Sequence, residues 1–156
     1  GEAVVSKTGH AFFKDAMRTS DAIYGGEVSA HHYFRDFAYC DSGIIPWLLI
    51  WEYLSISNHL LSDLIAEQRN RFPSSGELNF TVLDAAKCIE TIQHYFASSA
   101  TSIDQHDGLS MTFDTWRFNL RKSNTEALVR LNVETRGDHV LLQEKTNKLK
   151  LLIKQP

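Results

Sequence analysis

The chain has 156 residues, of which 43% are hydrophobic and 22% are charged, and its formal net charge at pH 7 is −3. This composition is typical of a globular protein and excludes disordered, collagen-like and low-complexity chains. The weakly acidic charge argues against nucleic acid or an anionic membrane as a partner. The longest apolar stretch, residues 44–51, contains Pro46 and is much shorter than the roughly 18 residues that a membrane-spanning helix needs. The two cysteines are far apart in the sequence, which suits a reducing compartment, and the chain does not open on a signal-peptide pattern. We therefore expect a cytoplasmic protein.

The first half of the chain predicts a mixture of short strands and helices. The apolar segment 44–55, which follows Asp41 and Ser42 as a helix start, is expected to be a buried helix. The next helix is expected to turn Leu60, Leu61, Leu64 and Ile65 inward. In chain order we expect a strand over 3–5, a helix over 10–18, a strand over 22–24 that ends at Gly25-Gly26, a strand or packed loop over 32–39, and helices over 44–55 and 58–71.

The second half predicts a separate α+β layer. Residues 72–76 are rich in helix breakers and are expected to form a hinge between a domain over 1–71 and a domain over 77–156. The helix over 85–97 is expected to bury Tyr95 and the final helix to bury Val140. In chain order we expect a strand over 78–82, a helix over 85–97, strands over 109–113, 116–120 and 127–133, and a helix over 138–154.

A polar loop between two of these strands, residues 121–126, is one candidate site. Its cations, hydroxyls and amide are groups that bind phosphate oxygens, and Arg130 lies on the following strand. A solvated hairpin tip has a similar composition, and spacing alone favours that simpler interpretation. The candidate phosphate-binding residues are Arg121, Ser123, Asn124, Thr125 and Arg130.

The segment that follows Gly25-Gly26 is a second candidate site. If it is extended, Glu27, Ser29 and His31 lie on one face, as a set that suits sugar hydroxyls and proton transfer. An ordinary half-exposed strand remains open. Metal binding by Glu27, His31 and His32 is disfavoured because adjacent residues of a strand point to opposite faces. Thr8-Gly9-His10 is a weaker third candidate, since any helix start looks similar.

These segments resemble motifs of the α-D-phosphohexomutase superfamily. Gly26-Glu27-Val28-Ser29-Ala30-His31 is similar to its sugar-specificity loop, and Arg121-Lys122-Ser123-Asn124-Thr125-Glu126 is similar to its C-terminal phosphate-binding loop. Lys7-Thr8-Gly9-His10 and Cys40-Asp41-Ser42-Gly43, each ahead of a helix, also fit. The resemblance covers essentially the whole chain, and within the superfamily it is strongest to the bacterial phosphomannomutases that supply GDP-mannose for surface polysaccharides.

The resemblance implies a role for each candidate residue. Glu27 and Ser29 would bind sugar hydroxyls, and His31 would lie near the reacting phosphoryl group with a possible part in proton transfer. Thr8, Gly9 and His10 would line the same cleft. The phosphate that does not react would be held by Arg121, Ser123, Asn124, Thr125 and Arg130. Val28 and Ala30 replace a common Met and Gly, which we take to be minor departures.

The resemblance also implies a fold and a set of missing parts. We expect the rear of a mixed α/β domain 3, followed by a small α+β, TBP-like domain 4 that closes over a hexose phosphate by rotation about residues 72–76. The family's phosphoserine loop and Asp-rich Mg²⁺ loop do not occur in the sequence. We therefore expect no metal ligands and no bound cofactor here, the Mg²⁺ and a hexose bisphosphate activator belonging to the full-length isomerase. The N-terminal domains of that enzyme are the expected partner, and the chain alone is expected to be inactive.

Other functions remain open. A phosphoglucomutase or phosphoglucosamine mutase would keep the fold and change the sugar. A non-catalytic anion-binding module would need residues 121–125 but neither Glu27 nor Ser29. A nucleic-acid surface built on Arg117, Arg121 and Arg136 is weaker, because neighbouring acidic residues dilute its charge.

Overall fold

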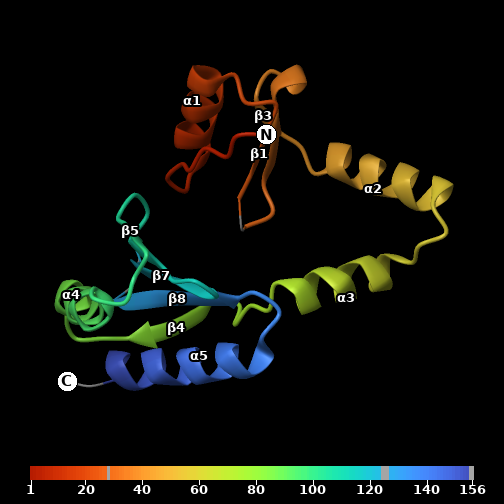
Figure 1. Ribbon diagram of the computed structural model, residues 1–156. Helices are drawn as coiled ribbons and strands as arrows, with labels where there is room; N and C mark the ends of the chain where they lie inside the picture. The colour runs from red at the N-terminus through yellow and green to blue at the C-terminus, as the bar shows by residue number, and fades with distance from the viewer. Residues whose placement is uncertain (28, 124–126, 155–156) are drawn as a thin grey trace. The chain divides into compact units, whose positions relative to one another are not determined.

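A computed structural model describes residues 1–27, 29–123 and 127–154. The chain divides into two compact units, Gly1–Asp63 and Leu64–Pro156. Each unit is described by itself, and Figure 1 shows the course of the chain through both.

The first unit is built on a three-stranded antiparallel sheet and one helix packed against it. Helix α1 (His10–Ser20) precedes β1 (Tyr24–Gly26), β2 (His32–Phe34) and β3 (Cys40–Asp41), and the strand order is β1-β2-β3. Gly25 lies so close to α1 that an added Cβ would be 2.8 Å from the Met17 sulfur. The glycine pair is therefore part of β1, which ends at Gly26, and Gly25 allows the helix to approach the strand closely. Residues 3–5 do not form the expected strand.

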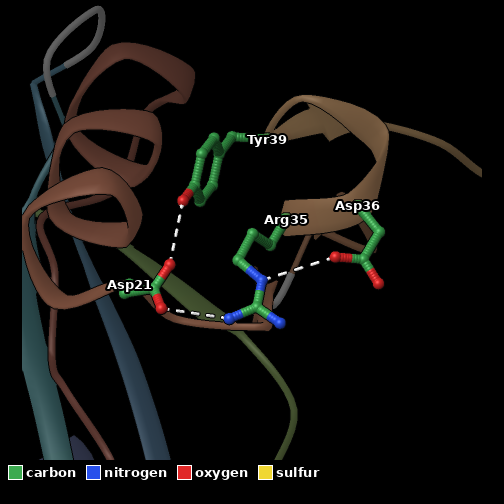
Figure 2. Close-up of polar contacts among 4 residues, drawn as sticks. All are labelled: Asp21, Arg35, Asp36 and Tyr39. Atoms are coloured by element: carbon green, nitrogen blue, oxygen red, sulfur yellow. Dashed lines mark hydrogen bonds and ion pairs between the residues drawn. The ribbon is translucent and has the colours of Figure 1, made fainter.

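A polar cluster fixes the connection between β2 and β3. The short helix η1 (Arg35–Phe37) begins directly after β2. Asp21, at the end of α1, accepts hydrogen bonds from Arg35 Nη1 at 3.1 Å and from the Tyr39 hydroxyl at 3.3 Å (Figure 2). Arg35 Nε also donates to Asp36 at 3.4 Å, and this bond and the Asp21 carboxylate raise the pKa of the Arg35 guanidinium. The cluster ties the turn to α1 and so places β3 beside β2.

Helix α2 (Ile44–Ile56) is apolar and exposed, so the expectation of a buried helix is wrong. None of its residues is buried, and the exposed fractions of Trp47, Leu48 and Trp51 are 57%, 52% and 62%. Helix α3 (Leu61–Arg71) likewise has no buried residue, so its expected inner face is not covered. Apolar periodicity predicts a helix but says nothing of what lies against it. No helix within the described residues is long and apolar enough to cross a membrane.

The second unit is an antiparallel five-stranded sheet with two helices on one face. The strands are β4 (Leu78–Thr81), β5 (Ser102–Asp104), β6 (Leu109–Thr112), β7 (Trp116–Lys122) and β8 (Leu128–Thr135), in the order β4-β8-β7-β6-β5. Alternate residues of β6, β7 and β8 form one core with α4 (Ala85–Phe96) and α5 (His139–Ile153). The sheet's other face carries polar side chains. This unit agrees with the α+β fold expected for the second half.

Three details of the second unit differ from expectation. Strand β5 was not anticipated, and Tyr95 and Val140 are 50% and 78% exposed although both were expected to face inward. The inward positions expected for Ile92 and Phe96 of α4 are confirmed, as are those of Leu149, Leu152 and Ile153 in α5, which also buries Thr146.

The breaker-rich segment 72–76 is hydrogen-bonded to β8. The Ser75 amide donates to the Val133 carbonyl at 2.9 Å, and the Val133 amide donates to Ser75 Oγ at 2.9 Å. The Thr135 amide donates to the Pro73 carbonyl at 3.0 Å. The domain boundary and hinge at this segment stay a prediction, and bending there would break these bonds.

Candidate functional site

The Glu27–His31 segment is the turn of the β1–β2 hairpin. The Glu27 amide donates to the His31 carbonyl at 2.9 Å, and the Ala30 amide donates to the Glu27 carbonyl at 3.0 Å. Ala30 has a φ of 64°, in the left-handed region. These contacts of Glu27, Ala30 and His31 close a turn, so the alternation that was to align Glu27, Ser29 and His31 does not apply. Ser29 lies exposed in the turn, and Val28 lies outside the described residues.

His31 is paired with Asp41, which lies on the neighbouring strand β3. His31 Nδ1 and Asp41 Oδ2 are 2.7 Å apart, and Asp41 Oδ1 accepts the His32 amide at 2.9 Å. The His31 contact, followed by the His32 amide, lowers the pKa of the Asp41 carboxyl. Because an ionised carboxylate only accepts hydrogen bonds, His31 donates from Nδ1 and keeps Nε2 for a ligand.

His10, at the start of α1, joins this pair. The centroids of the His10 and His31 rings are 4.5 Å apart, and Gly9 is the N-cap of α1, with Thr8 directly before it. His10, His31 and Asp41 each offer a ligand atom, and the three atoms lie within 4.8 Å of one another. Two imidazoles and one carboxylate suit Zn²⁺ or proton transfer more than Mg²⁺, which prefers oxygen ligands. This set does not fit the Mg²⁺ site that the family's chemistry implies.

Glu27 is fixed by Tyr33. The Tyr33 hydroxyl donates to Glu27 Oε1 at 2.5 Å, and Tyr33 is fully buried between its neighbours His10 and Phe13. Burial, and secondly the Glu27 carboxylate, raise the pKa of the Tyr33 hydroxyl, which therefore stays a neutral donor. Because this bond uses one oxygen of Glu27, the other oxygen can accept a hydroxyl from a ligand.

The second unit holds the candidate phosphate residues. Arg121 of β7 and Arg130 of β8 are register partners across the sheet, and Glu77 contacts both guanidinium groups at 3.1 Å. Ser123, the residue directly after β7, is buried, and its amide donates to the Leu128 carbonyl at 2.9 Å. Arg121 and Lys122 thus belong to the strand and not to the loop. Asn124 and Thr125 lie outside the described residues.

Two models of one protein family match nearly the whole chain. Residues 1–72 match the model described as phosphoglucomutase/phosphomannomutase, alpha/beta/alpha domain III. Residues 77–148 match the C-terminal domain of the same family. The chain belongs to the phosphoglucomutase/phosphomannomutase family. This confirms the resemblance drawn from the sequence motifs.

Curated relatives and a solved structure agree with this assignment. The chain is 55% identical to a phosphomannomutase of Salmonella typhimurium and 52% identical to one of Escherichia coli, each over 99% of the chain and 34% of the relative. A Xanthomonas campestris relative named "phosphohexose mutases" is 51% identical. A phosphoglucomutase/phosphomannomutase family protein from Burkholderia thailandensis superposes with a TM-score of 0.73 and 25% identity over 99% of the chain and 33% of its own length. The chain therefore spans about a third of the length of these relatives.

Sequence reasoning missed three residues of these two sites. Asp41 was named as a helix start and as part of the motif over Cys40–Gly43 but given no role in the site, Tyr33 had no assigned role, and Glu77 was not noted. The pairing of strands brings Asp41 to His31, and Glu77 reaches its arginines across separations of 44 and 53 residues. No local pattern encodes such contacts. The available signal for Asp41 was its place within the motif over Cys40–Gly43.

Proposed function

We propose that this chain supplies the sugar-reading and phosphate-binding parts of a phosphomannomutase, which interconverts mannose 6-phosphate and mannose 1-phosphate through a bisphosphorylated sugar. The observation that carries the proposal is the pair that His31, in the turn that also holds Glu27, makes with Asp41 of β3. The names of relatives at 52% and 55% identity support the choice of reaction.

Each described residue has a chemical task in this proposal. His31 Nε2 accepts the proton of the sugar hydroxyl that receives a phosphoryl group, and returns it in the reverse direction. Asp41 holds the ring in the required tautomer and stabilises its charged form. Glu27 accepts sugar hydroxyls, with Ser29, Thr8, Gly9 and His10 around it. Arg121, Ser123 and Arg130 hold the other phosphate, together with Asn124 and Thr125.

The remaining catalytic groups would come from other domains of the same enzyme. These would supply the phosphoserine and Mg²⁺, with a hexose bisphosphate as activator, in a cytoplasmic pathway to GDP-mannose. The exposed apolar helix α2 supports such a partner, because monomeric proteins rarely leave contiguous apolar surface uncovered.

The test compares adjacent histidines in a protein that joins this chain to the preceding domains. We expect His31→Gln to lower kcat for mannose 6-phosphate by about 100-fold or more, as loss of general acid–base catalysis does. His32→Gln is the matched control, because His32 Nδ1 instead contacts the Tyr24 hydroxyl at 2.7 Å. Equal loss in both variants, or none in His31→Gln, would contradict the proposal. Turnover by the 156-residue chain alone would contradict its expected inactivity.

Glucose phosphates are a second candidate substrate. The relative named "phosphohexose mutases", at 51% identity, favours an enzyme that accepts more than one hexose. Rates with glucose 6-phosphate and mannose 6-phosphate, measured in competition, would distinguish a dual-specificity enzyme from a mannose-specific one.

A further inference from the structure

A single carboxylate joins the two arginines of the candidate phosphate site. Glu77 Oε2 lies 3.1 Å from Arg121 Nη2, and Glu77 Oε1 lies 3.1 Å from Arg130 Nη1. The side chains of Arg121, Arg130 and Glu77 are 26%, 28% and 34% exposed. All three lie in the second unit, so this geometry does not depend on the first.

The strand register creates the need for such a carboxylate. Arg121 and Arg130 are directly opposite one another in the β7–β8 ladder. Like charges at opposed positions of a sheet repel and destabilise it, and partial burial reduces screening by solvent. Glu77, one residue before β4, neutralises one of the two charges. The three side chains together keep a charge of +1.

The bridge leaves most guanidinium donors available. Each guanidinium has five N–H groups in a rigid plane, and the contacts with Glu77 use one nitrogen of each. Arg130 Nε is buried and has no hydrogen-bond partner among the residues that the structure describes. A ligand with several acceptor oxygens can bind the guanidinium donors that remain exposed, and a phosphate monoester is such a ligand, whereas the buried Arg130 Nε is closed to it.

We propose that Glu77 is a positioning residue of this site, which holds the two guanidinium groups together and oriented so that they bind a phosphate dianion. The inference rests on the proposed phosphate-binding role of Arg121 and Arg130. Glu77 does not itself touch the phosphate. It lowers the cost of bringing two cations together before the ligand arrives, which is preorganisation.

Its replacement by glutamine tests this role. Glu77→Gln keeps the shape, removes the charge and leaves one acceptor oxygen, so that the two arginines separate. We expect the Kd for inorganic phosphate to rise about tenfold or more, because binding must then overcome the repulsion. Glu77→Asp keeps the charge but shortens the reach, and an intermediate Kd is expected.

Glu134→Gln is the matched control. Glu134 contacts Arg117 at 3.7 Å across the same two strands, where both side chains are about half exposed (54% and 50%). This substitution changes the net charge equally at a different arginine. We expect it to leave the Kd for phosphate within about twofold, since exposed pairs contribute little.

The experiment titrates inorganic phosphate into the 15N-labelled 156-residue chain and follows the Nε–Hε signals of Arg121 and Arg130. Selective weakening in Glu77→Gln supports the inference. An unchanged or lower Kd overturns it, and a lower Kd would mean that the carboxylate competes with phosphate. Equal weakening in Glu134→Gln also overturns it.

If Glu77→Gln does not fold, the Glu77→Asp variant decides, and a wild-type Kd for phosphate in that variant overturns the role of Glu77. No response of either arginine in the wild type would instead contradict the proposed phosphate site itself.

Discussion

Ala30 occupies the left-handed turn position that the related sugar loops commonly give to glycine. With its φ of 64°, the backbone conformation costs an L-residue roughly 1–2 kcal/mol. The replacement of Gly by Ala is therefore more than a minor departure, because it strains the turn that holds Glu27 and His31.

Ala30→Gly should stabilise the first unit. We expect the free energy of unfolding to rise by about 1 kcal/mol or less, because the greater freedom of glycine in the unfolded chain offsets part of the relieved strain. Denaturant unfolding measures the change. Ala16→Gly, in helix α1, is the control and should lower the free energy by about 1 kcal/mol. A loss of stability in Ala30→Gly would show that strain at this turn is small.

Asp41 should make the first unit sensitive to acid. Its contact with His31 lowers the pKa of the carboxyl, so the folded state favours the ionised form. The resulting stability is present above the ordinary pKa of about 4 and is lost as the pH falls toward the lower folded value. We expect the wild type to be more stable than Asp41→Asn at neutral pH, with a difference that shrinks below about pH 4.

Urea unfolding of both proteins between neutral and acidic pH measures that difference. A difference that stays constant down to the lowest pH would contradict the assigned pairing. The 15N shifts of the His31 ring give a second measurement, and we expect the hydrogen on Nδ1 at neutral pH.

At the scale of elements, the turn before β6 controls the position of β7. Gly108 has a φ of +74°, and an added Cβ would lie 2.5 Å from the Arg121 Cβ. The close approach leaves no room for a side chain. Any larger residue must displace the strand segment that carries Arg121.

Gly108→Ala should therefore cost more than backbone strain alone. Gly76→Ala is the matched control, because Gly76 has a φ of +65° but open space around it. We expect a loss of roughly 1–2 kcal/mol at Gly76 from left-handed strain. At Gly108 we expect about 1–3 kcal/mol more from overpacking. Thermal unfolding compares the two variants. Equal losses of stability would contradict the overpacking, because they would mean that β7 shifts to make room without a cost in free energy.

Most elements of the second unit follow from local patterns. Alternation predicts β7 and β8, since alternate residues of each strand, Trp116, Phe118 and Leu120 in β7 and Val129 and Leu131 in β8, are buried on the same face of the sheet. Strand β5 has one apolar residue, Ile103, and owes its form to pairing with β6, which no local pattern records. Likewise, the loop motif indicates Glu27 and His31, whereas Tyr33, Asp41 and Glu77 become site residues only through packing and strand pairing.

At the scale of the whole molecule, the two units differ in how much they bury. Among the described residues, Met17 and Tyr33 are the buried hydrophobic side chains of the first unit, while the second has a continuous core around Phe118 and Leu131. Stability within one chain varies in this way with the local density of buried contacts.

Hydrogen exchange should show this difference. We expect the slowest amides in β7 and β8 and fast exchange in α2, because α2 has no buried residue. The same measurement tests the predicted hinge over 72–76. The Ser75 and Gly137 amides donate at 2.9 Å to the Val133 and Arg71 carbonyls. If both amides are protected from exchange, residues 72–76 are not the hinge. Uniform protection across both units would contradict the difference in stability.

The three tryptophans are unequally placed. Trp47 and Trp51 are 57% and 62% exposed on α2, whereas Trp116 is 9% exposed and stacked on Phe113 at 4.1 Å between ring centroids. We expect the first pair to emit as solvent-exposed indoles and Trp116 as a buried one. Each unit thus contains its own intrinsic fluorophore, and red-edge excitation with quenching by iodide can separate their signals without any label. A partner that covers α2 would shift the emission of Trp47 and Trp51 to shorter wavelengths and leave that of Trp116 unchanged.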